Sequence, residues 1–355
     1  MVKFLSKMNT GPLFIALAAF LWTTDAFVRS NYDSILTGIQ IVLLEHLIIV
    51  IMISPLIVKY IPKLLELTKK EWGAVLFIGI GGSALATVAF TEGIFIGSPF
   101  QFIAVVILLQ QTQPLIAIGL SHLLLKERLP NFYYPLATVS LIGVFLIIFP
   151  TISGFTQSVG GLLNTLSQLT SSNGFLAGLL GLTAAFLWGS STVFGRYVME
   201  HGQQKPAYFQ MVTYRFFIAF IFLLLLIPFY SRSSLIEMGG FLNLSRYPSF
   251  EAIATFSLLT GLIYIALIVG LLSLLLYYYG LKTTHASMSA IAELAFPLSF
   301  FMIIPFLQSL GTEIIFPDSI QLLGSILLIS SATLLSYNYG KLFQKQIKKE
   351  VIITT

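Results

Sequence analysis

The chain has 355 residues, of which 57% are hydrophobic and 9% charged, and its mean hydropathy is +0.92. Soluble domains carry about 25% charged residues, so this composition excludes an ordinary soluble protein. The formal net charge of +5 does not indicate a nucleic-acid partner here, because it follows from the placement of basic residues around a membrane. Cysteine is absent, which excludes disulfides, thiolate metal sites and cysteine nucleophiles.

Apolar runs recur along nearly the whole chain, and each is long enough to cross a hydrocarbon core of ~30 Å as a helix. They predict an all-α integral membrane protein with ten transmembrane helices, because a barrel would show strict alternation instead. We expect the first run to remain a helix, since the apolar stretch before Ala16-Leu17-Ala18 is too short for a signal-peptide core. In chain order the expected spans are 11–31, 35–58, 72–95, 99–124, 131–150, 174–198, 207–230, 251–280, 284–310 and 317–340.

Lysine and arginine placement predicts the orientation. With the N-terminus inside, fifteen basic residues fall on cytoplasmic segments and three, Arg29, Arg232 and Arg246, fall on the opposite side. This positive-inside bias predicts that both termini are cytoplasmic. The basic tail, residues 341–355, is expected to lie along anionic lipid headgroups.

The sequence also repeats itself. The string Ala18-Ala19-Phe20-Leu21-Trp22 recurs as Ala184-Ala185-Phe186-Leu187-Trp188, and Gln113-Pro114 is matched later by Phe296-Pro297. Five spans per half is an odd number, so the second half enters the membrane from the opposite side, as in the inverted repeats of secondary transporters. The expected units are a first repeat over 1–150, an uncharged external linker over 151–173, and a second repeat over 174–340.

This order of landmarks resembles the drug/metabolite transporter superfamily, specifically its ten-helix EamA-type members. The residues that carry the resemblance are the early Trp of each half, the turn at 281–287, and the paired segments 110–129 and 293–313. The resemblance implies a 5+5 inverted repeat around a central cavity, in a bacterial inner membrane, that moves small organic solutes by alternating access. One departure is notable: related members often carry Arg in the second helix of each half, and Arg215 fits this pattern whereas Glu45 does not.

Ionisable side chains within a span are costly and usually face a cavity or a partner. They make Asp25, Glu45, His46, Arg215 and Glu293 candidates for solute binding or proton coupling. Glu293 lies about nine residues into its helix, close to the bilayer midplane. Pro297 has no amide hydrogen, and we expect it to break the helix and free the backbone carbonyl of residue 293. A carboxyl and an unpaired carbonyl at this depth suit a proton or an amine.

The first half offers a matching geometry. Pro114 is expected to break its helix and free the carbonyl of Gln110, beside Gln111 and Gln113. We expect these glutamines to form hydrogen bonds with a solute. The alternative for both halves is a pair of simple kinks whose polar residues bond between helices.

Four further candidates sit in the first and second spans. Glu45 and His46 can form a proton relay, since histidine titrates near neutral pH, or Glu45 can pair with Arg215 or another basic group. As neighbours on a helix they point about 100° apart and need not share a partner. Asp25 can guard an outer vestibule or pair with Arg29 one turn later. Trp22, like Trp188 in the second half, can offer a flat face to an aromatic or cationic solute or act as packing.

The sequence favours a carrier over an enzyme. It has no metalloprotease or hydrolase nucleophile motif, and it predicts no metal and no cofactor. We therefore expect a secondary transporter of a small organic metabolite such as an amino acid, amine, nucleoside or drug-like solute, acting as an exporter that couples to protons or runs downhill. An exchanger or importer fits the same residues, and an intramembrane lipid-modifying enzyme is the remote alternative. Two complete halves make a monomer sufficient and are compatible with a homodimer.

Overall fold

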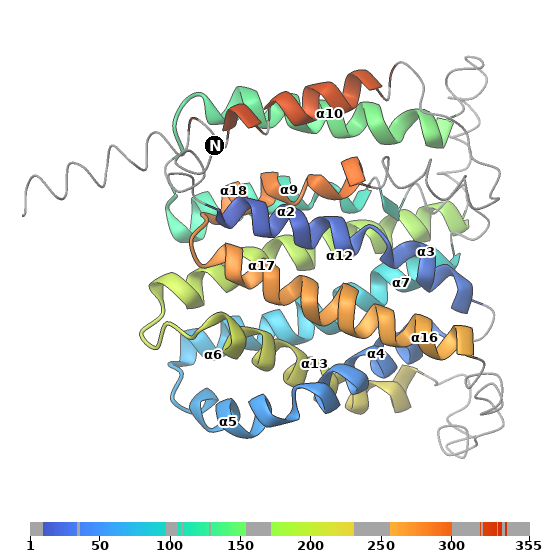
Figure 1. Ribbon diagram of the computed structural model, residues 1–355, viewed down its shortest axis with the longest axis vertical. Helices are drawn as coiled ribbons and strands as arrows, with labels where there is room; N and C mark the ends of the chain where they lie inside the picture. The colour runs from blue at the N-terminus through green and yellow to red at the C-terminus, as the bar shows by residue number, and fades with distance from the viewer. Residues whose placement is uncertain are drawn as a thin grey trace, which may run out of the picture.

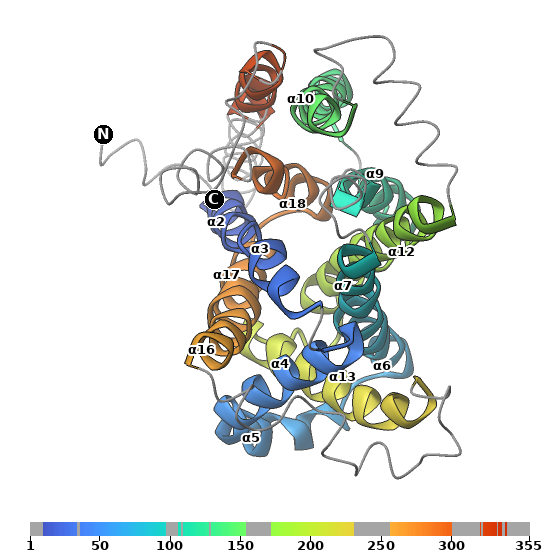
Figure 2. The ribbon, with the colours of Figure 1, turned by 90° about the vertical axis from the view of Figure 1, so that its right-hand side faces the viewer.

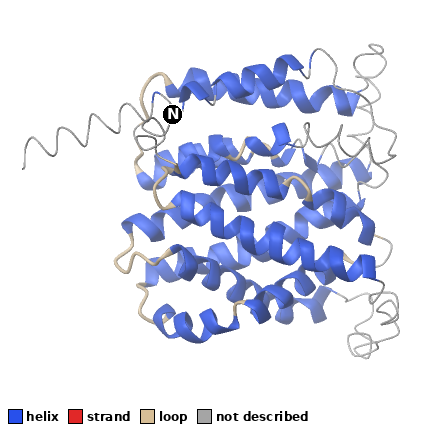
Figure 3. Cartoon of the chain, in the orientation of Figure 1, coloured by secondary structure: helices blue, strands red, loops and turns tan. Residues whose placement is uncertain are grey.

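A computed structural model gives the structure of the chain. It describes residues 10–33, 36–96, 106–107, 109–127, 129–153, 172–230, 256–299, 320, 322–331, 333–335 and 338. Within these residues all regular structure is helical and there is no strand (Figure 3). Most of the expected linker, the 231–250 loop and the basic tail lie outside the described residues. We call residues 10–153 the N-terminal part and residues 172–338 the C-terminal part.

The helices of the N-terminal part include two π-helical segments, η2 and η3, and one short 3₁₀ turn, η1. In order they are α2 (Gly11–Trp22), α3 (Asp25–Arg29), η1 (Ser30–Tyr32), α4 (Gly38–Met52), α5 (Ser54–Leu64), α6 (Lys69–Leu76), η2 (Phe77–Leu85), α7 (Ala86–Ile96), α9 (Gln113–Leu120), η3 (Ser121–Leu125) and α10 (Tyr133–Ser153).

The helices of the C-terminal part likewise include two π-helical segments, η4 and η6. In order they are α12 (Ser172–Arg196), η4 (Tyr197–His201), α13 (Tyr208–Tyr230), α16 (Phe256–Tyr264), η6 (Ile265–Leu272), α17 (Ser273–Leu281) and α18 (Ala286–Ala292).

Every expected span contains helix, but length and apolarity qualify only some of the described segments as membrane crossings. Five qualify, or six if the bent pair α4 and α5 counts as one, and three shorter apolar helices accompany them. The five are Gly11–Tyr32, Lys69–Ile96, Phe175–His201, Tyr208–Phe229 and Leu259–Leu281. The structure is thus that of a multi-pass helical protein, and the count of ten crossings stays a prediction.

The expected second span, 35–58, is wrong at its end. Helix α4 stops at Met52, and α5 leaves it at an angle of 91°. Pro55 in the first turn of α5 explains the stop, because it has no N–H to donate to the preceding turn. Two exposed lysines, Lys59 and Lys63, then make α5 unsuitable for the hydrocarbon core.

Side chains mark the starts of two helices that build the interior. Thr37 and Gln40 form a capping box at the start of α4, where Gln40 accepts the Thr37 N–H at 2.9 Å. Thr68 and Glu71 form the same motif at α6. Because these caps satisfy otherwise unpaired amide groups, each helix begins at a defined residue.

Helices from the two parts interleave. Helix α2 packs against α17, and α7 packs against α12, so that each pair joins the N-terminal to the C-terminal part (Figures 1 and 2). In Figure 2, α2 and α17 lie on one flank of the molecule and α7 and α12 on the other. Helix α10 lies next to residues 322–331, as shown by a hydrogen bond of 2.8 Å between the hydroxyls of Ser140 and Ser331.

The small residues of η2 allow helices to approach closely, as the run of Gly and Ala between Gly79 and Ala86 predicts. A Cβ added to Gly79 would lie 2.6 Å from the Ile218 side chain of α13. A methyl group on Gly82 would overlap Ser191 of α12. Helices α13 and α12 therefore approach η2 too closely at these two positions for a larger side chain.

Glu127 joins the two parts at one end of the molecule. Its carboxylate accepts hydrogen bonds from the backbone N–H of Ala286 (3.0 Å), the backbone N–H of Ser287 (3.3 Å) and the Ser287 hydroxyl (2.6 Å). His285 Nδ1 lies 3.6 Å away. Burial alone raises the pKa of Glu127, but the hydrogen bonds from His285, Ser287 and Ala286 outweigh it and lower the pKa to about 2.

Candidate functional site: a polar cavity between the two parts

One cavity draws its walls from both parts of the chain and has a volume of about 980 Å³, including its solvent-open portion. All ten residues that the sequence singled out for binding or proton coupling line it, as does Pro114, whereas Pro297 is buried outside the lining. The ten are Trp22, Asp25, Glu45, His46, Gln110, Gln111, Gln113, Trp188, Arg215 and Glu293.

Helices are interrupted where they meet this cavity. Turns occur at Thr23–Thr24, Gln111–Thr112 and Glu293–Leu294. The last two are the breaks expected near Pro114 and Pro297. Interrupted helices at mid-membrane are a common way to build a transport site, because their backbone groups and side chains can turn toward a ligand.

The expectation that Pro297 frees the carbonyl of Glu293 is wrong. The backbone N–H of Phe296 donates to that carbonyl at 3.0 Å. The chain tightens into a turn three residues long, so a different amide replaces the one that proline lacks. The polar group available at this point is therefore the Glu293 side chain.

The Glu293 carboxylate, only 7% exposed, is held by three donors. Tyr277 Oη and Ser289 Oγ each donate to its Oε1 at 3.1 Å. Gln113 Nε2 donates to its Oε2. This last bond crosses the cavity from the N-terminal to the C-terminal part and ties the two predicted half-sites together.

The three glutamines form a single hydrogen-bonded chain that ends at Glu293. Gln111 Nε2 donates to Gln110 Oε1, and Gln110 Nε2 donates to Gln113 Oε1, both at 2.8 Å. Because an ionised carboxylate can only accept, it sets the direction of every amide in the chain. Protonation of Glu293, or binding of a ligand to it, would therefore alter the hydrogen bonds of the chain as far as Gln111.

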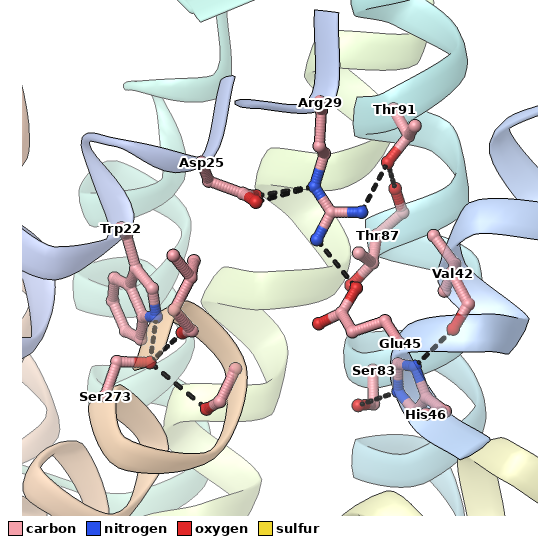
Figure 4. A network of polar contacts seen from close by, with 12 residues as sticks. Trp22, Asp25, Arg29, Val42, Glu45, His46, Ser83, Thr87, Thr91 and Ser273 are labelled. Atoms are coloured by element: carbon pink, nitrogen blue, oxygen red, sulfur yellow. Dashed lines mark hydrogen bonds and ion pairs between the residues drawn. The ribbon is translucent and has the colours of Figure 1, made fainter. Parts of the chain in front are cut away.

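A cluster of three charged side chains lies on the N-terminal part (Figure 4). Arg29, 1% exposed, donates from Nε to Asp25 at 2.7 Å and from Nη2 to Glu45 Oε2 at 2.7 Å. Its Nη1 reaches the hydroxyl of Thr91 at 3.4 Å. The pairing of Asp25 with Arg29 is confirmed.

The expected pairing of Glu45 with a basic group is confirmed, and the partner is Arg29, not Arg215. One expectation about this cluster needs correction. Arg29 was expected in an external segment, whereas it is buried and lines the cavity. Its two carboxylate partners compensate for the cost of burying its charge.

His46 has different partners from Glu45, as the angle between neighbouring helical side chains predicts. Its Nδ1 lies 2.8 Å from the carbonyl of Val42, and its Nε2 lies 3.0 Å from Ser83 Oγ (Figure 4). Both ring nitrogens are thus occupied within the protein. This geometry fits a packing role at least as well as a proton relay with Glu45.

Two aromatic pairs line the cavity. Trp22 lies 5.5 Å from Tyr277, and Trp188 lies 5.3 Å from Phe90, measured between ring centroids. In each pair the repeated tryptophan comes from one part of the chain and its partner from the other. Trp22 is also fixed by a hydrogen bond of 2.6 Å from Nε1 to Ser273 Oγ (Figure 4).

Arg29, Tyr277 and Thr192 are cavity residues that sequence reasoning missed as site residues. Thr192 and Tyr277 share a hydrogen bond of 2.7 Å next to Glu293. A signal existed for Tyr277: consecutive tyrosines at 277–279 point in three directions, so one of them can face inward while Tyr279 stays 45% exposed. Within the described residues no group of three or more His, Asp or Glu side chains is close enough to hold a metal ion.

Three comparisons bear on these observations. A sequence model described as the EamA-like transporter family matches residues 9–149 and again residues 175–337. The riboflavin transporter ImpX of Fusobacterium nucleatum subsp. nucleatum is 29% identical over 294 residues, which cover 81% of this chain and 86% of that protein. A solved crystal structure superposes on 93% of this chain and 97% of its own, with a TM-score of 0.61 and 15% identity, a likeness that shows a shared fold alone.

Proposed function

Because the chain belongs to the EamA-like transporter family, we propose that it is a secondary transporter that carries a small organic solute through this cavity by alternating access. The observation that carries the proposal is the hydrogen bond between Gln113 and Glu293, which joins the two parts across the cavity. A solute that replaces this bond would contact both parts at once. Its binding would then be coupled to their relative movement.

The proposed architecture is a 5+5 inverted repeat, with residues 1–150 and 174–340 as repeats and 151–173 as an external linker. Reciprocal packing supports it: the first span of each repeat (α2 or α12) lies against the third span of the other (α17 or α7). The third spans each contain a π-helical segment, η2 and η6, next to the cavity. The two matches to one family are a further support.

The proposed solute is a planar heteroaromatic metabolite, and riboflavin is the first to test. Trp22 with Tyr277 and Trp188 with Phe90 give the cavity two aromatic walls on which a flat ring can stack. The glutamine chain supplies amides to hydrogen-bond ring heteroatoms. The name of the Fusobacterium relative agrees with such a solute.

Glu293 is the proposed proton site, since it is a buried carboxyl in the cavity whose donors all come from neutral side chains. The proposed direction is export, driven by protons or by the solute gradient. Initial rates measured from each side of the membrane separate export from import and from exchange. The termini are proposed to face the cytoplasm of a bacterium, with the monomer as a sufficient unit.

The test is riboflavin counterflow in proteoliposomes, followed by flavin fluorescence at several pH values. We expect wild-type flux to depend on pH and Glu293→Gln to remove that dependence while the protein stays folded. Glu66→Gln, at an exposed position outside the cavity, should behave as wild type. Absence of counterflow would contradict a carrier, and unchanged pH dependence in Glu293→Gln would eliminate the proton role.

A further inference from the structure

Arg215 differs from Arg29, the other arginine of the cavity, because its hydrogen-bond partners are neutral. Its Nη2 donates to the carbonyl of Gly82 at 2.8 Å, and its Nη1 lies 3.4 Å from Tyr278 Oη. Among the residues that the structure describes, no carboxylate pairs with it within 4.0 Å. Its Nε is buried without a hydrogen-bond partner, and the residue is 7% exposed.

The repeat shows why no carboxylate forms an ion pair with Arg215. Gln40 to Glu45 in the first half matches Gln210 to Arg215 in the second. Glu45 receives Arg29, which stands seven residues after the repeated Trp22. Seven residues after Trp188 stands Gly195, which has no side chain to offer. The first half therefore pairs Glu45 with an arginine, whereas the matching position of the second half supplies no ion-pair partner for Arg215.

A buried guanidinium is stable only if something accepts its hydrogen bonds. Arg215 lines the cavity, so an acceptor can approach the guanidinium from there. A guanidinium presents pairs of parallel N–H groups and suits a planar pair of acceptors. Carboxylates have this geometry, and so do neighbouring carbonyls on a heteroaromatic ring.

We infer that Arg215 binds the hydrogen-bond-accepting edge of the transported solute. This inference rests on the proposed transport function and adds to it the chemistry of one end of the solute: a carboxylate, or paired ring carbonyls. The two aromatic pairs then contact the flat body of the solute. Arg215 is thereby the residue that selects for an acceptor edge.

The test measures binding to purified protein with three probes. Indole-3-acetate and indole-3-acetamide differ in charge but little in shape, and riboflavin carries ring carbonyls without a negative charge. The variants are Arg215→Gln, which removes the charge, and Arg215→Lys, which keeps the charge but loses the planar fork. The matched control is Arg196→Gln, a buried arginine outside the cavity lining whose Nη1 donates to the carbonyls of Leu281 and Lys282.

We expect Arg215→Gln to weaken binding of the acceptor-bearing probe about tenfold, with Arg215→Lys intermediate and Arg196→Gln unchanged. If Arg215→Gln abolishes the preference for indole-3-acetate over indole-3-acetamide, the site binds a carboxylate. If it weakens binding of riboflavin alone, the site binds ring carbonyls. If wild type binds none of the probes, or Arg215→Gln changes no affinity by more than about twofold, the inference is overturned. Riboflavin counterflow is measured separately. The transport proposal and the role of Arg215 can therefore be rejected independently of each other.

Discussion

Replacing Glu127 with glutamine tests how the two parts of the chain are held together. The side chain is 6% exposed, and its carboxylate accepts three hydrogen bonds from residues 286 and 287 on the other part. A fall of its pKa from 4.5 to about 2 corresponds to about 3 kcal/mol of stabilisation. Glutamine keeps one acceptor oxygen but turns an N–H₂ group toward a second donor. We therefore expect Glu127→Gln to lower the free energy of unfolding by about 1–3 kcal/mol at neutral pH.

The pH dependence of this loss has a defined sign. The lowered pKa means that Glu127 stabilises the folded protein fully above about pH 4.5, and that this stabilisation disappears as pH falls toward 2. The difference in thermal stability between wild type and Glu127→Gln should thus be constant from neutral pH to about pH 5 and shrink below it. Differential scanning fluorimetry of the detergent-solubilised proteins measures this, with the exposed Glu66→Gln as control. Equal stability at neutral pH, or a gap that grows on acidification, would refute the reasoning.

Two further predictions concern packing and charge in the interior. Gly82→Ala should lower the free energy of unfolding by about 1–3 kcal/mol, because the new methyl group overlaps Ser191. Gly73→Ala, with no atom within 4 Å of the new Cβ, should raise it by about 0.5–1 kcal/mol. Similar shifts of the melting temperature in both variants would be contrary to this packing. Arg29→Met should cost about 3–5 kcal/mol because two carboxylates lose their counter-ion, and adding Asp25→Asn with Glu45→Gln should restore most of the loss. A triple variant as unstable as the single one would exclude charge burial as the cause.

Composition predicted the helical class. The ten candidate residues, chosen from six expected spans, all line a single cavity, because polar groups within apolar helices have few places to go except a shared interior. Pairing was harder to predict. The partner of Glu45 depends on the turn after Trp22, which hydropathy does not reveal.

Local backbone geometry was the least predictable. The stop at Met52 was hidden by an apolar run that continues past it, and only Pro55 and the following lysines marked it. At Glu293 the proline rule correctly indicated a break but wrongly predicted a free carbonyl, because the N–H of Phe296 donates to the carbonyl of Glu293. Tyr277 was missed because one helical face among three tyrosines cannot be chosen without the neighbouring helices.

Alternating access requires this cavity to open to each side of the membrane in turn. Because the chain has no cysteine, Thr192→Cys places one thiol in the cavity and Val58→Cys, at a residue 79% exposed, provides a control. A membrane-impermeant thiol reagent is added to one side of oriented vesicles at a time, with and without riboflavin. We expect the cavity thiol to react from both sides, riboflavin to slow that reaction, and the control to be unaffected by riboflavin. Reaction of the cavity thiol from one side only, at a rate that riboflavin does not change, would exclude alternating access through this cavity.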